Sequence, residues 1–150
     1  MYPKFSQMDS NALKNPKLKK IRRFLSNLNN INRGGCGFAA VAMYDILKQQ
    51  GFEPVIMFAY HSWNQERYQT NEAAKKCNGT FTSCSHAFIK IDNVYFDCAC
   101  NVDITEYRML QIMGRDEVVM ALKEDDEWNY SFDRDANVPT IEKMTGIKIL

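Results

Sequence analysis

The sequence predicts a single α+β domain, with helices and antiparallel strands in separate parts of the chain. Two helical patterns, residues 16–29 and 36–50, come first. Strand-like apolar runs follow at residues 54–60, 86–91 and 94–98. Segregation of this kind is typical of α+β proteins. A chain of 150 residues is the size of one domain, 1–150, and buries enough surface to need neither disulfides nor a metal for stability.

The two helices are predicted from their apolar spacing. Residues 16–29 begin with a proline, which suits a first turn, and repeat apolar side chains on one face: Leu18, Ile21, Leu25 and Leu28. Residues 36–50 are apolar on most sides, and the glycine that follows them ends the pattern. Because a helix of this kind lies in the middle of a domain, we expect it to be central and to pack on a small antiparallel sheet.

The strands and connections are predicted from apolar runs and turn residues. Residues 54–60 predict a buried strand, and residues 86–91 and 94–98 flank Asp92-Asn93, a favourable two-residue hairpin turn. The polar stretch 61–83 is long for a loop in a compact domain, so we expect it to shape or gate a binding site.

The rest of the chain is less regular. Residues 1–15 are polar and predict an irregular N-terminal segment. Residues 105–113 and 116–123 have helical patterns, and residues 124–137 predict an acidic loop. We expect a last short helix or strand to begin after Pro139.

Charge is unevenly distributed along the chain, although the net charge is only +1. Residues 1–33 contain eight Lys or Arg and one Asp, and residues 116–135 contain eight acidic and two basic residues. We expect two solvated faces that attract each other, with an anionic partner at the basic N-terminal helix as the alternative.

The location of the protein is predicted from what the sequence lacks. The first ten residues, MYPKFSQMDS, have no apolar stretch of the kind found in secretory signals, and no apolar run approaches the ~18 residues that span a membrane. Five cysteines are an odd number without a secretory context, which favours reduced thiols and a cytoplasmic protein.

Cys36 is the candidate nucleophile. It lies in Arg33-Gly34-Gly35-Cys36-Gly37, immediately before the predicted central helix. The unpaired N–H groups of a helix N-terminus stabilise a thiolate, lower its pKa below the ~8.5 of a free cysteine, and can bind an oxyanion. The flanking glycines would let a substrate backbone approach closely.

The hairpin register places a candidate base beside a carboxylate. With Ile91 opposite Val94, one face of the hairpin is wholly apolar, and the other carries His86, Phe88, Lys90, Tyr95 and Asp97. His86 and Asp97 are then diagonal neighbours, with backbones ~7 Å apart, which one hydrogen bond between the side chains can bridge. His61 is a rival base, but no predicted register pairs it with a carboxylate.

These segments, GGCGFAAVAMYDILKQQG and SHAFIKIDNVYFDC, resemble the papain-like cysteine peptidase superfamily in its broad sense, which includes transglutaminase-like and arylamine-acetyltransferase-like enzymes. The resemblance covers about residues 30–100 and is greatest to the short members of phages and bacteria. It implies Cys36 as nucleophile, His86 as base and Asp97 as the acid that orients it. It also implies an oxyanion amide, for which Asn30 and Asn32 are at suitable distances, although glutamine is more common there.

The function implied is a cysteine hydrolase or acyltransferase that acts on an amide, isopeptide or thioester bond of a peptide or protein, without a metal or cofactor. One alternative is an inactive papain-like module that grips a host protein. A second is a zinc domain that uses four cysteines within 24 residues, although their spacing does not match the usual zinc pairs: Cys77, Cys84, Cys98 and Cys100.

Overall fold

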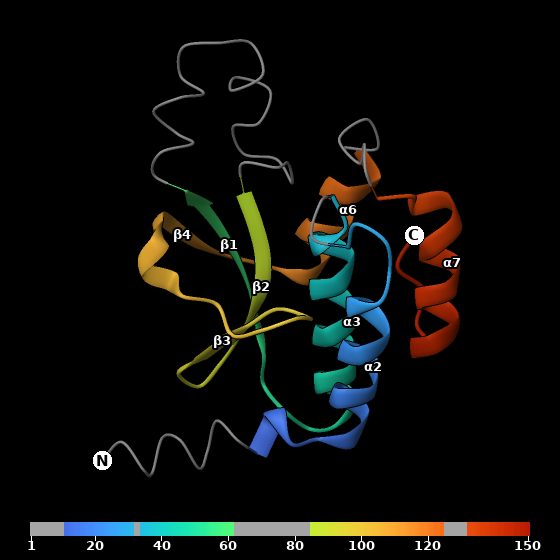
Figure 1. Ribbon diagram of the computed structural model, residues 1–150, viewed down its shortest axis with the longest axis horizontal. Helices are drawn as coiled ribbons and strands as arrows, with labels where there is room; N and C mark the ends of the chain where they lie inside the picture. The colour runs from blue at the N-terminus through green and yellow to red at the C-terminus, as the bar shows by residue number, and fades with distance from the viewer. Residues whose placement is uncertain (1–10, 32–33, 62–84, 125–131) are drawn as a thin grey trace.

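The computed structural model describes residues 11–31, 34–61, 85–124 and 132–150 of the chain (Figure 1). The predicted α+β class is confirmed. In these residues the strands form one antiparallel sheet in the order β3-β2-β1-β4, and helices α2, α3, α6 and α7 lie to one side of it. Most of the predicted irregular segment 1–15 and of the predicted loop 61–83 falls outside the described residues.

Helix α2, Pro16–Ser26, begins as predicted and ends three residues early. Asn15 caps it, because its side-chain oxygen accepts hydrogen bonds from the N–H groups of Lys17 and Leu18 at 3.0 and 3.1 Å. The predicted apolar face is buried through Leu18, Ile21 and Leu25. The face opposite is exposed and basic, so in this stretch the prediction of a solvated charged surface holds.

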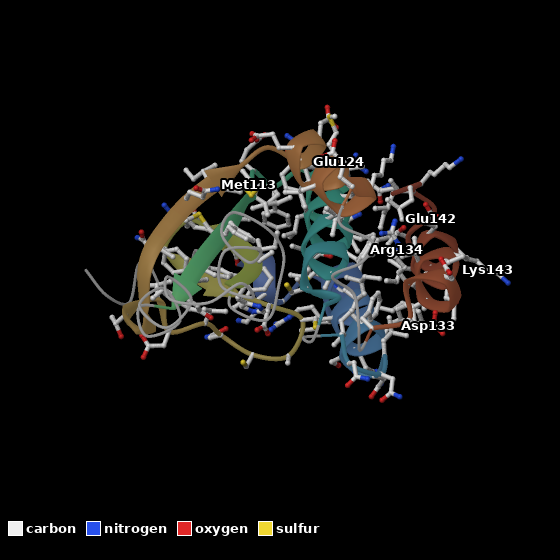
Figure 2. The ribbon with its side chains drawn as sticks, turned by 90° about the horizontal axis from the view of Figure 1, so that it is seen from above. Met113, Glu124, Asp133, Arg134, Glu142 and Lys143 are labelled. Carbon is white, nitrogen blue, oxygen red and sulfur yellow. The ribbon has the colours of Figure 1, made fainter. Side chains whose placement is uncertain are left out.

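Helix α3, Cys36–Gln49, is the central helix that the sequence predicts. It packs on β1 and β2 and is also in contact with α2, α6 and α7. Figure 2 shows it between the sheet and α7. Almost every side chain of α3 is buried, which explains why its sequence lacks a polar face.

The sheet has the predicted hairpin register. Strands β1, Val55–His61, β2, Ser85–Ile91, and β3, Val94–Phe96, pair antiparallel, with Ile91 opposite Val94 and Ile89 opposite Phe96. The predicted apolar face packs against α3, and a smaller cluster around Phe88 lies on the other face. Strand β3 ends earlier than expected, because the chain turns back and the N–H of Asp97 bonds the carbonyl of Cys100 at 2.9 Å.

The helix predicted over residues 105–113 is wrong. A short 3₁₀ turn, η1, Ile104–Glu106, leads into strand β4, Tyr107–Met113, which pairs with β1. Leu, Met and Gln favour helices by themselves, but β1 offers an unpaired edge here, and pairing with it outweighs a weak local propensity. Leu110 and Ile112 stay exposed on this edge strand.

The C-terminal helices are predicted only in part. Helix α6, Arg115–Glu124, is confirmed, but the acidic loop does not extend to residue 137, because helix α7, Arg134–Thr145, begins within it. Asp133 caps α7 by accepting a hydrogen bond from the N–H of Ala136 at 3.1 Å. Pro139, expected to precede the last element, lies inside α7, where burial of its neighbours offsets one missing hydrogen bond.

The two oppositely charged segments are not joined by any ion pair among the described residues. No described helix is both long enough and apolar enough to span a bilayer.

Candidate active site

The three residues predicted to form a site come together at one end of the sheet. Cys36 is the first residue of α3, His86 is the second residue of β2, and Asp97 directly follows β3. His86 Nε2 lies 3.0 Å from Asp97 Oδ2, so the diagonal contact expected from the register is present. The Cys36 thiol lies close enough to the His86 ring for each group to shift the pKa of the other. Because Asp97 engages Nε2, Nδ1 is the ring nitrogen left for the sulfur.

Asp97 is held by its own turn. Its Oδ1 accepts hydrogen bonds from the N–H groups of Ala99 and Cys100, both at 2.8 Å. Burial raises the pKa of this carboxyl, but the hydrogen bond to His86 and these two N–H groups outweigh it and lower the pKa below its ordinary value. Asp97 is therefore an ionised acceptor in a fixed orientation.

The His86 ring is strongly basic in this setting. Burial alone would lower its pKa, but hydrogen bonds to Asp97 and to Cys36, with the negative charges of both, raise the pKa to about 10. The ring also lies 5.6 Å from the ring of Phe88, which is itself in contact with Tyr107 at 6.0 Å. The rings of Phe88 and Tyr107 thus form an aromatic cluster beside the imidazole.

Cys36 is an acidic thiol despite its burial. Burial raises its pKa, but the hydrogen bond and charge of His86, with the backbone N–H groups of Ala87 and Gly37, bring the pKa below its ordinary value. A lowered thiol pKa beside a raised imidazole pKa favours a thiolate–imidazolium pair. Such a pair is the usual form of an activated cysteine nucleophile.

The N-terminus of α3 adds partial positive charge at the sulfur. No side chain of the described residues caps the helix at Gly35, and its first hydrogen bond runs from the N–H of Ala39 to the Gly35 carbonyl at 3.0 Å. The preceding N–H groups are left to stabilise negative charge, either on the thiolate or on an oxyanion formed beside it.

Two of the three glycines around Cys36, Gly35 and Gly37, are required by the packing of the protein itself, and the approach of a substrate to these glycines stays a prediction. A Cβ on Gly35 would lie 2.6 Å from the carbonyl oxygen of Ile31 and 2.7 Å from Phe132 Cδ1. A Cβ on Gly37 would lie 2.8 Å from Leu122 Cδ2. The first turn of α3 is therefore fixed between these side chains.

The other candidate residues are placed less fully. Asn30 lies in an exposed turn with φ of 60°, and Asn32 is outside the described residues, so their oxyanion role stays a prediction. His61 is the last residue of β1 and lies opposite Tyr107; its side chain is among those not described.

The zinc alternative depends on four cysteines, of which Cys98 and Cys100 belong to the described residues. Within the described residues, no group of three metal-binding side chains comes together. Cys98 is a buried free thiol on the core side of the hairpin, and Cys100 is an exposed one. Cys77 and Cys84 lie outside the described residues.

The sequence does not identify Arg22 as a residue near the site, because it is one of eight Lys or Arg in residues 1–33. Its side chain turns inward and donates from Nε to the backbone carbonyl of Asp97 at 3.0 Å. The available signal was weak: Arg22 lies one helical turn from both Leu18 and Leu25, which are buried, so it borders the apolar face of α2.

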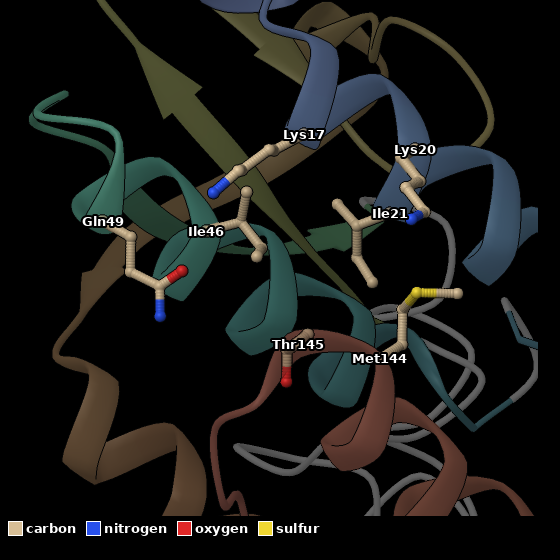
Figure 3. Close-up of a pocket in the computed structure, with 7 residues that line it drawn as sticks. All are labelled: Lys17, Lys20, Ile21, Ile46, Gln49, Met144 and Thr145. Atoms are coloured by element: carbon tan, nitrogen blue, oxygen red, sulfur yellow. The ribbon is translucent and has the colours of Figure 1, made fainter.

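A separate cavity of ≈ 180 Å³ lies between α2, α3 and α7, near the end of α3 that is remote from Cys36. Lys17 and Lys20 border it, and Ile21, Ile46 and Met144 supply apolar walls (Figure 3). None of the three residues of the candidate active site lines it.

Comparison with known proteins adds no family to these observations. No protein-family model, no curated protein and no solved structure matches the chain.

Proposed function

We propose that this protein is a cysteine-nucleophile hydrolase or acyltransferase that acts on an amide, isopeptide or thioester bond. The observation that carries the proposal is the chain of contacts from Cys36 through His86 to Asp97, with the sulfur at the N-terminus of a buried helix. Both pKa shifts have the direction that covalent catalysis needs, because the thiol pKa is lowered and the imidazole pKa is raised.

In the first half of the reaction, the Cys36 thiolate attacks the carbonyl carbon of the substrate. The carbonyl π electrons move to oxygen, and the backbone N–H groups at the start of α3 stabilise the oxyanion. When the tetrahedral intermediate collapses, the imidazolium of His86 gives its proton to the departing nitrogen or sulfur. The products of this half are a thioester on Cys36 and a neutral imidazole.

In the second half, water or an acceptor amine attacks the thioester. His86 takes the proton of the attacking group, and collapse of the second tetrahedral intermediate expels the Cys36 thiolate. Water gives hydrolysis and an amine gives acyl transfer, so the same three residues serve both reactions. Throughout, Asp97 keeps the ring in one orientation and balances its positive charge.

The arrangement resembles papain-like enzymes in its general plan, which supports a peptide or protein substrate. In both, a thiol opens a central helix and meets an imidazole and a carboxylate carried by an antiparallel sheet. Cys36 is only 5% exposed, so the substrate must bring its carbonyl to a nearly buried sulfur. An extended chain, such as a peptide or an isopeptide linker, reaches a buried sulfur more easily than a compact group does.

Thiol reactivity tests the proposal directly. At about pH 6, iodoacetamide should alkylate Cys36 faster than every other cysteine, because thiolate is the reactive form. Burial raises the pKa of Cys98 to about 12 and also raises that of Cys100, so both should react slowly. Mass spectrometry of peptides from a time course gives the five rates separately. Equal rates would favour a binding module and contradict the proposal.

Turnover gives the second test. The protein should release thiophenol from a peptidyl thiophenyl ester, and Cys36→Ala should abolish the release without changing the circular dichroism spectrum. Cys100→Ala is the matched control, because it removes an exposed thiol that lies in the same turn as Asp97. Unchanged release by Cys36→Ala would end the proposal.

A further inference from the structure

We propose that Arg22 is a positioning residue for the candidate active site and acts by fixing the backbone of Asp97; this rests on the function proposed above. Arg22 lies on α2, far from the hairpin in sequence. Its Nε–H donates to the Asp97 carbonyl oxygen at 3.0 Å, across 75 residues of chain.

The Arg22 guanidinium makes two contacts with the hairpin. Besides the hydrogen bond to Asp97, its central carbon lies 4.9 Å from the ring centroid of Phe96, the last residue of β3. A planar guanidinium makes both contacts at once, and stacking on the ring fixes the direction of Nε. Arg22 is the only basic residue of α2 that is partly buried, since Lys17, Lys19, Lys20 and Arg23 are all exposed.

Asp97 needs this support because most of its hydrogen bonds lie within its own turn and do not hold that turn against the helices. Its N–H bonds Cys100, its Oδ1 accepts from Ala99 and Cys100, and its Oδ2 meets His86. The first two sets of bonds are internal to the 97–100 turn and would move with it. The bond from Arg22 to the Asp97 carbonyl ties the turn to a helix that packs against α3. Arg22 therefore sets the position of the carboxylate relative to the helix that carries Cys36.

Loss of the hydrogen bond from Arg22 to Asp97 should change the amount of Cys36 thiolate in a predictable direction. The titratable groups that interact with Arg22 are Asp97, Cys98 and Cys100. If the turn drifts, the Asp97–His86 hydrogen bond weakens, and the imidazolium loses part of its stabilisation. The thiolate of Cys36 depends on that imidazolium, so less thiolate forms at mildly acidic pH.

The test compares Arg22→Met with Arg23→Met by the rate of Cys36 alkylation between about pH 5 and pH 8. Methionine keeps an apolar stem on Phe96 but removes the donor and the charge. We expect Arg22→Met to slow alkylation at the acid end by about threefold to tenfold, the usual effect of one hydrogen bond, and to match wild type at the alkaline end. Arg23→Met should match wild type throughout, because Arg23 is bonded through its backbone carbonyl, and its side chain makes no hydrogen bond or ion pair with the described residues.

Two further variants separate positioning from charge and from simple destabilisation. Arg22→Lys keeps the charge without the planar donor, so it should remain slow, and a full rescue would overturn the positioning role. In an Asp97→Ala background, Arg22→Met should have no further effect on the rate. A slowing as large as in the wild-type background would show that Arg22 does not act through Asp97.

The outcomes distinguish this inference from the function on which it rests. Fast alkylation of Cys36 in both wild type and Arg22→Met, with identical pH profiles, would overturn the role of Arg22 and leave the thiol enzyme intact. Slow alkylation of Cys36 in wild type itself would overturn both.

Discussion

Asp45, in the middle of α3, and Arg115, the first residue of α6, form a two-point ion pair. Nε lies 2.7 Å from Oδ1, and Nη2 lies 2.8 Å from Oδ2. The carboxylate is buried among apolar side chains, and Arg115 also binds the carbonyl of Lys148. This pair fixes where α6 begins and, with it, the position of Leu122 against Gly37.

Arg115→Met should therefore lower the free energy of unfolding by about 2–3 kcal/mol, because it leaves the Asp45 carboxylate buried without its partner. Urea denaturation followed by circular dichroism measures the loss. Arg115→Met combined with Asp45→Leu should recover most of it, since a well-packed apolar pair replaces a buried ion pair at little cost. A single variant as stable as wild type would contradict the structural role.

Gly35→Ala should destabilise the protein more than Gly37→Ala. The new Cβ at Gly35 would meet the Ile31 carbonyl, which is backbone, whereas at Gly37 it would meet the flexible end of Leu122. Overpacking of this kind costs about 1–3 kcal/mol, with Gly35→Ala at the upper end. The measurement is the urea midpoint of each variant.

Gly114→Ala is the matched control for these glycines, because its Cβ would meet only the end of the Glu117 side chain, at 3.2 Å. We expect its urea midpoint to stay close to that of wild type. Equal shifts of the urea midpoint in all three variants would contradict the packing seen at Gly35.

The Cys36–His86 pair should leave a signature in the dependence of stability on pH. For His86, the pKa in the folded state is about 10, above the ordinary 6.5, so its stabilising contribution is complete below 6.5 and lost as pH rises to about 10. For Cys36, the pKa is lowered from 9.0, so its contribution is complete above 9.0 and lost as pH falls. Between pH 6.5 and 9.0 the stabilising contribution of His86 falls while that of Cys36 rises. The two changes offset each other, so their sum should form a plateau in this range.

The plateau is measured as the difference in unfolding free energy between wild type and Cys36→Ala across this range of pH. Below the plateau the difference should fall as the pH is lowered, and above it the difference should fall again as His86 loses its proton. A difference that peaks at one end of the range would mean that the two groups are not paired.

Asp97→Asn should slow thioester turnover without abolishing it. Asparagine keeps the side-chain oxygen that the Ala99 and Cys100 N–H groups bind, so the turn stays in place. It removes the charge that supports the imidazolium, so we expect turnover at neutral pH to fall below that of wild type and to stay above that of a variant without the base. The acid limb of the pH profile should also move to higher pH, because the pKa of Cys36 rises when His86 is less basic.

His86→Asn is the comparison for this variant, since it removes the base itself and should lose nearly all turnover. If Asp97→Asn were as inactive as His86→Asn, Asp97 would have a larger part in the reaction than orientation.

Much of the site was predictable because it depends on local rules. The hairpin from Ser85 to Phe96 alternates strictly between an apolar and a mixed face, and this period of two fixes which residues are neighbours. The same reasoning placed Cys36 at a helix start, since the helical pattern begins there.

The remainder depends on contacts that no local pattern encodes. Residues 107–113 have helix-forming side chains and become strand β4 only because the edge of β1 is available to pair with them. Arg22 is one basic residue among several, and only the packing of α2 turns it toward Asp97. The space at Gly35 and Gly37 is taken by Phe132 and Leu122, which lie near the other end of the chain.

The distance along the chain between Cys36 and its partners also bears on biosynthesis. Cys36 leaves the ribosome well before His86. The contact between Arg22 and Asp97 forms later still, because Asp97 is synthesised after His86. During that time nothing lowers the pKa of the sulfur except a helix that has not yet packed. The nascent polypeptide thus carries an ordinary thiol, and the pKa of Cys36 is lowered only when the hairpin packs against α3.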